Sequence, residues 1–377
     1  MNDSYSNFLD AFEDAVDAYY KEDYKTAHKL FLPLAEQGDD EAQFNLGMMY
    51  AFGLGVPQNY KEAFKWYRLA AEQEFDEAQY SLGVMHTLGL GVPQNYKEAL
   101  NWYRFSAEQG HERAQYNLGV MYDEGHGVQQ DYNEAVKWYR LSAEQGDAEA
   151  QFNLGIVYDQ GQGVQQDYKE AVKWFLLSAE QGNADAQYSL GYMYYEGQGV
   201  PQDYEEAVKW FRLATKQGCA EAQCNLGVMY YEGIGVPQDS IEAVKWWRLS
   251  AEQGFAQAQC SLGSIYLSQD DKEAIKWFRL AAEQGDAEAQ YNLGGRYFEG
   301  EGVPQDNKES LKWYLRAANQ GHVTAQLNIG IAFLNGGGVP KDYKVAMSWF
   351  RLAADEGEET ATFWMGEMYR HGLGVPK

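Results

Sequence analysis

The chain has 377 residues, of which 45% are hydrophobic and 15% aromatic, and its formal net charge is −26 at pH 7. Because this apolar fraction is enough to bury a core, wholesale disorder is not expected despite the charge. No apolar run approaches the roughly 18 residues of a membrane-spanning helix, and strong acidity repels nucleic-acid phosphate. We therefore expect neither membrane insertion nor nucleic-acid binding.

The start of the chain and its cysteines indicate a cellular compartment. The first residues, MNDSYSNFLDAFEDAV, are acidic where a secretory signal would be basic and then apolar. The three cysteines, Cys219, Cys224 and Cys260, are too few, and odd in number, for a disulfide framework. These features predict a cytoplasmic protein in a reducing compartment.

Two helices are predicted before the regular part of the chain. They run from Tyr5 to Gly38 and are joined through Lys21 to Asp23, without a glycine-rich loop between them. Residues 1–38 are therefore predicted to form a separate N-terminal helix pair.

From residue 39 onward the sequence repeats itself. An apolar residue followed by glycine recurs every 36 residues, with a single step of 31 residues, and a tryptophan series from Trp66 to Trp349 follows the same spacing. Such a period is typical of stacked supersecondary units. The apolar residues of the series are Leu46, Leu82, Leu118, Leu154, Leu190, Leu226, Leu262, Leu293, Ile329 and Met365.

Each unit is predicted to contain two helices, which we name the A helix and the B helix. In one unit, apolar residues at helical spacing predict an A helix over 112–124 and a B helix over 132–145. Gly119 interrupts the A helix at a cost of roughly 1 kcal/mol relative to alanine. Its recurrence in nearly every unit indicates that a neighbouring helix approaches closely there.

The ends of the B helices are also marked. Asp131 and Glu134 form a predicted capping box at the start of one B helix. A glycine such as Gly146 follows the last turn, where the chain must adopt a left-handed conformation. Glu74 is the exception among these glycines, so the helix end before it is predicted to be weaker.

Two units depart from the pattern. The unit beginning near Gln257 has lost the glycine loop and reads Ser268 to Asp271 instead, which shortens the connection between its helices. The last A helix, predicted at about residues 358–371, is followed by a loop and then by the end of the sequence at Lys377. Its apolar surface would be free to associate with a second molecule.

The segments AQYNLGVMYDEGHGV and DYNEAVKWYRLSAEQG resemble the Sel-one-like repeat (SLR) family, a relative of the tetratricopeptide repeat. The resemblance extends from Asp39 to Pro376 in consecutive copies, and residues 1–38 look like a tetratricopeptide-type cap. It implies an all-α fold, an α/α right-handed superhelical solenoid of stacked antiparallel helix pairs. The A helices would line its concave face and the B helices its convex face.

The predicted organisation is therefore a cap at 1–38 and a repeat array at 39–377. The array would hold nine helix pairs, one of them shortened near 257–287, and a terminal unpaired helix. The resemblance further implies a bacterial protein that acts as an adaptor in assembling protein complexes.

The motifs of known serine and zinc hydrolases are missing from the sequence. No serine has a lysine three residues later, and no Gly-x-Ser-x-Gly elbow occurs. The six histidines are dispersed, and His111-Glu112 lacks the second ligand of a zinc-protease motif. We predict no enzymatic activity, no cofactor and no metal site. The alternative is an envelope-associated factor with β-lactam-type hydrolase or glycan-binding activity.

A second stripe on the A helices, offset from the core stripe, is the predicted binding surface. Aromatic rings lie two positions before the repeated apolar residue, and amides or hydroxyls lie one position before it. Amides suit an extended ligand because they both donate to and accept from a peptide backbone. The alternatives are ring packing between helices and amide bonds to the neighbouring unit. The candidates are Tyr80, Tyr116, Phe152, Tyr188 and Tyr291, with Asn45, Asn117, Asn153, Asn225, Asn292 and Asn328.

Acidic residues continue the same stripe at positions whose chemistry varies between units, which suggests that they select the partner. Together these features predict a non-enzymatic protein-protein interaction scaffold. Its acidic, aromatic- and Asn-lined concave groove would bind an extended, basic segment of another protein. The acidic candidates are Asp123, Glu124, Asp159, Glu196, Glu232 and Glu299.

Overall fold

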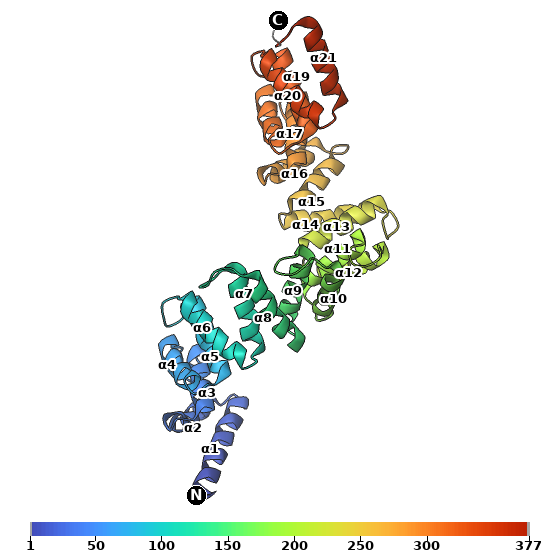
Figure 1. Cartoon of the computed structure of the whole chain (residues 1–377). Coiled ribbons are helices and arrows are strands. Elements are labelled where there is room, and N and C mark those ends of the chain that lie inside the picture. The colour runs from blue at the N-terminus through green and yellow to red at the C-terminus, as the bar shows by residue number, and fades with distance from the viewer. Residues whose placement is uncertain (1, 375–377) are drawn as a thin grey trace. The chain divides into compact units, whose positions relative to one another are not determined.

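The computed structural model of the chain describes residues 2–374, and every regular element among them is an α-helix (Figure 1). The predicted all-α fold of paired helices is confirmed. The chain divides into two compact units, Met1–Gln202 and Asp203–Lys377, which we describe one at a time. Of the loop predicted after the last helix, residues 375–377 lie outside the described residues.

The first unit contains eleven helices within residues 2–202. Two of them form the predicted N-terminal pair and are joined through Lys21 to Asp23. The helices are α1 (Asn2–Tyr20), α2 (Tyr24–Glu36), α3 (Asp40–Phe52), α4 (Tyr60–Ala71), α5 (Asp76–Leu88), α6 (Tyr96–Glu108), α7 (Glu112–Glu124), α8 (Tyr132–Gln145), α9 (Ala148–Gln160), α10 (Tyr168–Glu180) and α11 (Ala184–Glu196).

The described part of the second unit contains ten helices. They are α12 (Tyr204–Lys216), α13 (Ala220–Glu232), α14 (Ser240–Glu252), α15 (Ala256–Tyr266), α16 (Asp271–Glu283), α17 (Ala287–Glu299), α18 (Asn307–Ala318), α19 (Val323–Asn335), α20 (Tyr343–Asp355) and α21 (Glu359–His371).

Odd-numbered helices from α3 to α21 are the A helices, and even-numbered helices from α4 to α20 are the B helices. Within each unit, a helix contacts chiefly the helices just before and after it in the chain. The predicted spans 112–124 and 132–145 are confirmed as α7 and α8.

Glycine inside most A helices lets an aromatic ring of the following B helix come close. A Cβ atom added at Gly119 would lie 2.6 Å from a ring atom of Tyr139, which is 1% exposed. The predicted close approach is confirmed, and its partner is the B helix of the same repeat. In the second unit the corresponding pairs are Gly227 with Trp247, Gly263 with Phe278, Gly294 with Tyr314 and Gly330 with Phe350.

The start of each B helix is capped, although not by the full capping box. Asp131 Oδ1 accepts hydrogen bonds from the backbone N–H groups of Asn133 and Glu134, as predicted. The Asp131 N–H does not donate to the Glu134 carboxylate, as a capping box requires, because it donates to the Tyr122 carbonyl over 2.9 Å. The Glu134 carboxylate accepts instead from Lys137 Nζ. The chain is thereby tied back to the A helix, which fixes the loop between the helices.

The second glycine of each loop packs on the preceding repeat. Gly127 has a φ of 74°, and a Cβ atom there would lie 2.5 Å from the carbonyl oxygen of Tyr96, the first residue of α6. Glycine is needed at this position for both reasons, since it tolerates positive φ and leaves room for the approaching backbone.

Buried glutamines connect three successive helices. Gln115 of α7 is 4% exposed; its Nε2 donates to the Ala107 carbonyl over 3.1 Å, and its Oε1 accepts from Gln145 Nε2 over 2.8 Å. The buried amide is therefore satisfied by the B helices on both sides, which fixes their register. The same two bonds are made by Gln43, Gln79, Gln151, Gln259 and Gln290.

The unusual repeats differ as the sequence indicates. Helix α15 has 11 residues, whereas α13 and α17 have 13, and the turn after it is closed by the Gln269 and Asp270 N–H groups donating to the Tyr266 carbonyl. In α21, a Cβ atom added at Gly366 would meet nothing within 4 Å. No aromatic ring covers that glycine in the described part of the chain.

Candidate functional site

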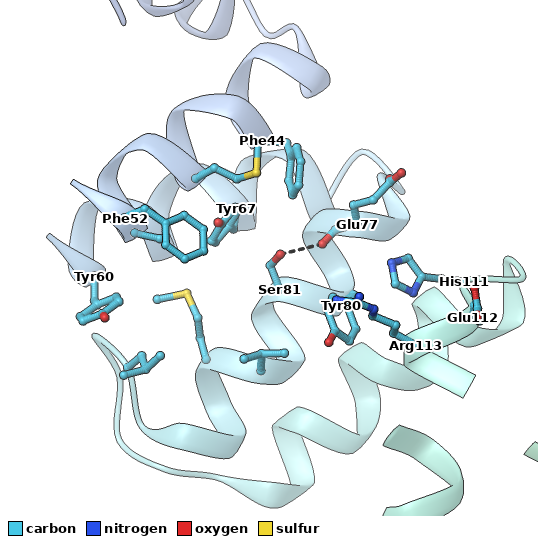
Figure 2. Close-up of a pocket in the computed structure, with 15 residues that line it drawn as sticks. Phe44, Phe52, Tyr60, Tyr67, Glu77, Tyr80, Ser81, His111, Glu112 and Arg113 are labelled. Carbon is cyan, nitrogen blue, oxygen red and sulfur yellow. Dashed lines mark hydrogen bonds between the residues drawn. The ribbon is translucent and has the colours of Figure 1, made fainter. Parts of the chain in front are cut away.

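The largest described pocket in the first unit lies between α3, α5 and the start of α7. Its volume is about 750 Å³, which is within the range of roughly 300–1,000 Å³ typical of ligand sites. Figure 2 shows Phe52 and Tyr60 at one end of the pocket, and His111 and Glu112 at the other. The remaining lining residues are Phe44, Met48, Ala51, Tyr67, Glu77, Tyr80, Ser81, Val84, Met85, Leu90 and Arg113.

The repeat pattern itself creates this pocket. Leu46 and Leu82 are fully buried in the stripe that faces the B helices. Residues two positions after them, Met48 and Val84, are only half-buried because they lie on the adjoining face of the A helices. Phe52 lies one turn further along α3 and is 69% exposed. The outer face of α3 is thus apolar where later repeats carry acidic residues.

One end of the pocket is acidic. A hydrogen bond to Asp76 and burial, together with the nearby charges of Asp76 and Glu41, raise the pKa of Glu77 to about 7. No ion pair to Glu41, Asp76, Glu77 or Glu112 occurs among the described residues. Arg113 also lines this end, so a single guanidinium faces several carboxylates.

A histidine fixes the boundary between α5 and α7. The ring of His111 stacks on Tyr80 with centroids 4.7 Å apart, and its Nδ1 accepts from the Ala114 N–H over 3.2 Å. Burial lowers the pKa of His111. The neutral ring therefore caps α7 and forms part of the pocket wall, because a protonated Nδ1 could not accept that hydrogen bond.

A second pocket in the first unit lies between α9 and α11. It has a volume of about 370 Å³ and includes Asp159, Tyr188, Ile156 and Tyr192. Burial raises the pKa of Asp159. The same junction between successive A helices is therefore hollowed at two places in this unit.

The second unit has a related pocket of about 410 Å³ between α17, α18 and α19. Phe298, Asn328 and Ile331 line it. Asn307, which also lines it, stands where other B helices begin with tyrosine, such as Tyr343.

The predicted amides face groups of the protein itself. Asn117 lies near the hydroxyl of Tyr103, Asn153 near those of Tyr116 and Tyr139, and Asn328 near those of Tyr291 and Tyr314, where each amide opposes the rise in tyrosine pKa that burial causes. These tyrosines belong to the preceding repeat, so the surroundings of these three amides favour the alternative of a role within the array. Asn45 and Asn292 bond to the preceding turn of their own helices, and Asn225 is half-buried.

The predicted aromatic residues are half-buried and pack on other rings. Tyr80, Tyr116, Phe152 and Tyr291 each lie within 6.0 Å of the B-helix ring that covers the glycine. Tyr188 packs on Tyr192 at 6.5 Å. These rings form walls of the A-helix surface, and only Tyr80 and Tyr188 among them line the pockets described above.

The predicted acidic residues differ in their surroundings. Asp123 accepts a hydrogen bond from the Tyr139 hydroxyl over 3.0 Å, and Asp159 lines the pocket between α9 and α11. Glu124, Glu196, Glu232 and Glu299 are exposed; Glu124 contacts His126 at 2.9 Å, and Glu299 pairs with Arg296 at 2.8 Å. These four glutamates are the part of the predicted acidic stripe that solvent reaches.

Sequence reasoning missed the apolar end of the largest pocket. Phe52 and Leu88 occupy the position that carries Glu124, Glu196, Glu232 and Glu299 in later repeats, and they are 69% and 62% exposed. The signal was an apolar residue at a position where other repeats are charged.

Among the described residues, the cysteines and the potential metal ligands do not cluster into a redox or metal site. Cys224 and Cys260 are 0% and 7% exposed, and burial raises the pKa of Cys224 to about 12. No group of three or more metal-ligating side chains occurs among the described residues. Within the same residues, no helix is both long and apolar enough to cross a membrane.

Comparison with known proteins gives a consistent family. The Sel1 repeat family matches residues 17–39, 40–75, 76–111, 112–147, 148–183, 184–219, 220–255, 256–286, 287–322, 323–358 and 360–377. No curated protein matches the chain in sequence.

Two solved structures are similar over much of the chain. One is c5321, a protective antigen of uropathogenic Escherichia coli strains that displays an SLR fold; it shares 37% identity with a TM-score of 0.89, over 98% of this chain and 81% of that chain. The other is a Sel1 repeat protein from Oxalobacter formigenes, with 35% identity and a TM-score of 0.57, over 64% of this chain and 96% of that chain.

Proposed function

The chain belongs to the Sel1 repeat family, and from that premise we propose that it is a non-enzymatic scaffold that binds a segment of another protein along its A helices. Sel1 repeat proteins generally mediate protein-protein interactions. The observation that carries the proposal is the position of the pockets. Three of the described pockets open between successive A helices, next to predicted aromatic or amide residues, whereas one of about 550 Å³ lies beside α1 and one of about 320 Å³ lies on the B helix α16.

Charge favours a basic partner for this surface. The A helices carry seventeen acidic and three basic residues, whereas the B helices carry sixteen acidic and twenty-two basic residues. Such complementarity speeds encounter and selects the sign of the partner. The exposed carboxylates Glu124, Glu196 and Glu232 would meet its lysines or arginines.

The amides have a narrower role in this proposal than the sequence suggested. Asn117 and Asn153 lie beside tyrosines of the preceding repeat, so their replacement would disturb packing as well as binding. The described residues offer nothing that favours the hydrolase or glycan-binding alternative, and we do not propose it. The cytoplasm is the proposed location.

Self-association through α21 is a separate proposal, supported by Phe363 and Tyr369, which are 59% and 54% exposed there.

The test compares charge reversal on the two kinds of helix. Fluorescence anisotropy would measure binding of labelled fifteen-residue peptides, rich either in Lys and Phe or in Glu and Phe, to the full chain. The variant Glu124→Lys, Glu196→Lys, Glu232→Lys should weaken binding of the basic peptide at least tenfold at low salt. Its matched control reverses three exposed B-helix carboxylates, Glu144→Lys, Glu180→Lys and Glu252→Lys.

The control variant changes net charge by the same amount, so a general field effect would act on both proteins equally. The difference should shrink at 0.5 M salt, because the screening length falls below about 10 Å. Equal affinities for both variants, or no binding of the basic peptide by the wild-type protein, would overturn the proposal.

A further inference from the structure

We propose that the pocket between α3 and α5 anchors one large apolar side chain of the bound segment, and that its acidic end holds a lysine or arginine within two residues of that anchor. This inference rests on the proposed function, because it names the chemistry that one part of the A-helix surface selects. Its occupant is a protein segment, with an aromatic or large aliphatic residue next to a cation.

The preference for a large apolar side chain rests on the walls of the pocket. Phe44, Met48 and Val84 line it, and Phe52 stands at its edge with 69% of its surface exposed. An exposed phenylalanine beside a cavity of about 750 Å³ leaves unfavourable apolar surface in water. A bound apolar side chain would cover Phe52 and fill part of the cavity.

The preference for a lysine or arginine of the partner rests on the carboxylates at the other end of the pocket. Glu77 and Glu112 line the pocket, and the charges of Asp76 and Glu41 act on Glu77. Arg113 is the one described cation that lines it. An ammonium or guanidinium group from the partner would relieve the repulsion between these carboxylates, and acidic partners would be rejected by the same charges.

The spacing follows from the geometry of an extended chain. Side chains of residues i and i+2 point to the same side of an extended segment, roughly 7 Å apart. Figure 2 shows the polar side chains His111, Glu112 and Arg113 gathered away from Phe52 and Tyr60. A segment that crosses from α3 towards α7 would present its apolar residue first and its basic residue next.

The first experiment uses two substitutions at the same position of successive repeats. Phe52→Ala removes the edge of the pocket, whereas Leu88→Ala changes an equally exposed residue, 62% against 69%, that does not line it. Binding of a labelled fifteen-residue peptide with a central Phe-x-Lys should weaken about tenfold with Phe52→Ala and less than twofold with Leu88→Ala. Both variants should keep the wild-type melting temperature, since both side chains are mostly in water.

The second experiment separates the two halves of the site. Replacing the peptide's central Phe by Ala should cost about tenfold in affinity for the wild-type protein and less than threefold for Phe52→Ala. Glu77→Gln should weaken binding of the Lys peptide but leave its Met analogue unchanged. Its control, Glu149→Gln at the same position of a later repeat, should affect neither peptide.

The outcomes are distinguishable. If the basic peptide binds but Phe52→Ala and Leu88→Ala behave alike, the pocket is not the anchor, and the proposed function stands without it. If no peptide binds the wild-type protein, the proposed function itself fails. Binding of free phenylalanine or an aromatic alcohol as tightly as the peptide would overturn the inference in favour of a small-molecule site.

Discussion

Glu74 shows how a single residue can weaken a repeat. It has a φ of 67° and its N–H donates to the Ala71 carbonyl, whereas Gly110 makes the equivalent bond to Ala107 in the next repeat with a φ of 101°. A non-glycine residue in this conformation is strained by roughly 1–2 kcal/mol. We predict that Glu74→Gly raises the free energy of unfolding by about 1 kcal/mol. Urea denaturation checks this, with Gly110→Glu expected to lower it.

The glycine inside each A helix provides a matched pair of substitutions. Alanine at position 119 would place its Cβ atom 2.6 Å from Tyr139, whereas alanine at position 366 would meet nothing within 4 Å. We predict that Gly119→Ala destabilises by about 1–3 kcal/mol through overpacking. Gly366→Ala should instead stabilise α21 by up to about 1 kcal/mol, because alanine is the better helix former. Thermal melts of both variants measure the difference, and equal effects would contradict the packing described.

The carboxylate of Glu77 predicts a pH dependence of stability. Its pKa is about 7 in the folded protein and lies near 4.5 when unperturbed, because Asp76 hydrogen-bonds to it and burial disfavours its charge. The folded state therefore binds more protons than the unfolded state between these values, so this group's contribution falls as pH rises from about 4.5 to 7. Glu41, Glu112, His111 and Arg113 are other titratable or charged groups close by.

It follows that Glu77→Gln should stabilise the protein relative to wild type at pH 8 and have little effect at pH 5. Melting temperatures across this range test the sign. A stabilisation that is the same at both pH values would show that Glu77 is not responsible.

At the scale of the helix, the short repeat is the expected weak point. The loop after α13 packs Gly235 on the carbonyl of Tyr204, but α15 is followed by a turn with no such glycine. The repeat therefore lacks one of the contacts that hold the others to their predecessors. We predict the fastest amide exchange of the A-B connections at residues 267–270, as measured by hydrogen-deuterium exchange. Uniform protection across all connections would contradict this.

The bounds of the helices could be predicted from the sequence. Which residues on the outer face of the A helices pack against the neighbouring repeat could not. The apolar spacing of Ala114, Leu118 and Met121 placed α7 correctly because that stripe packs locally against the next helix. Asn153 is a predicted ligand residue, yet its amide lies beside tyrosines of the preceding repeat. Which side chains meet across a repeat junction depends on how the units stack, and the period alone does not contain that information.

At the scale of the whole molecule, the A helices and the B helices differ in charge and in their part in the core. A helices carry most of the unneutralised acidic charge and border the three pockets that lie between repeats, while B helices supply the rings that fill the core and most of the basic residues. Because each repeat buries its core against its neighbours, several repeats would contribute to the binding of one extended segment. This division leads to the proposal that the A helices form the binding surface.

The measurement that tests this most directly is photo-crosslinking of a bound peptide to the full chain. A basic fifteen-residue peptide with a benzophenone at its central apolar position would be irradiated with the wild-type protein, and the crosslinked residues identified by mass spectrometry. The account predicts crosslinks on A helices, concentrated around Met48, Phe52 and Val84. Crosslinks confined to the exposed leucines of the B helices, such as Leu141 and Leu249, would contradict it.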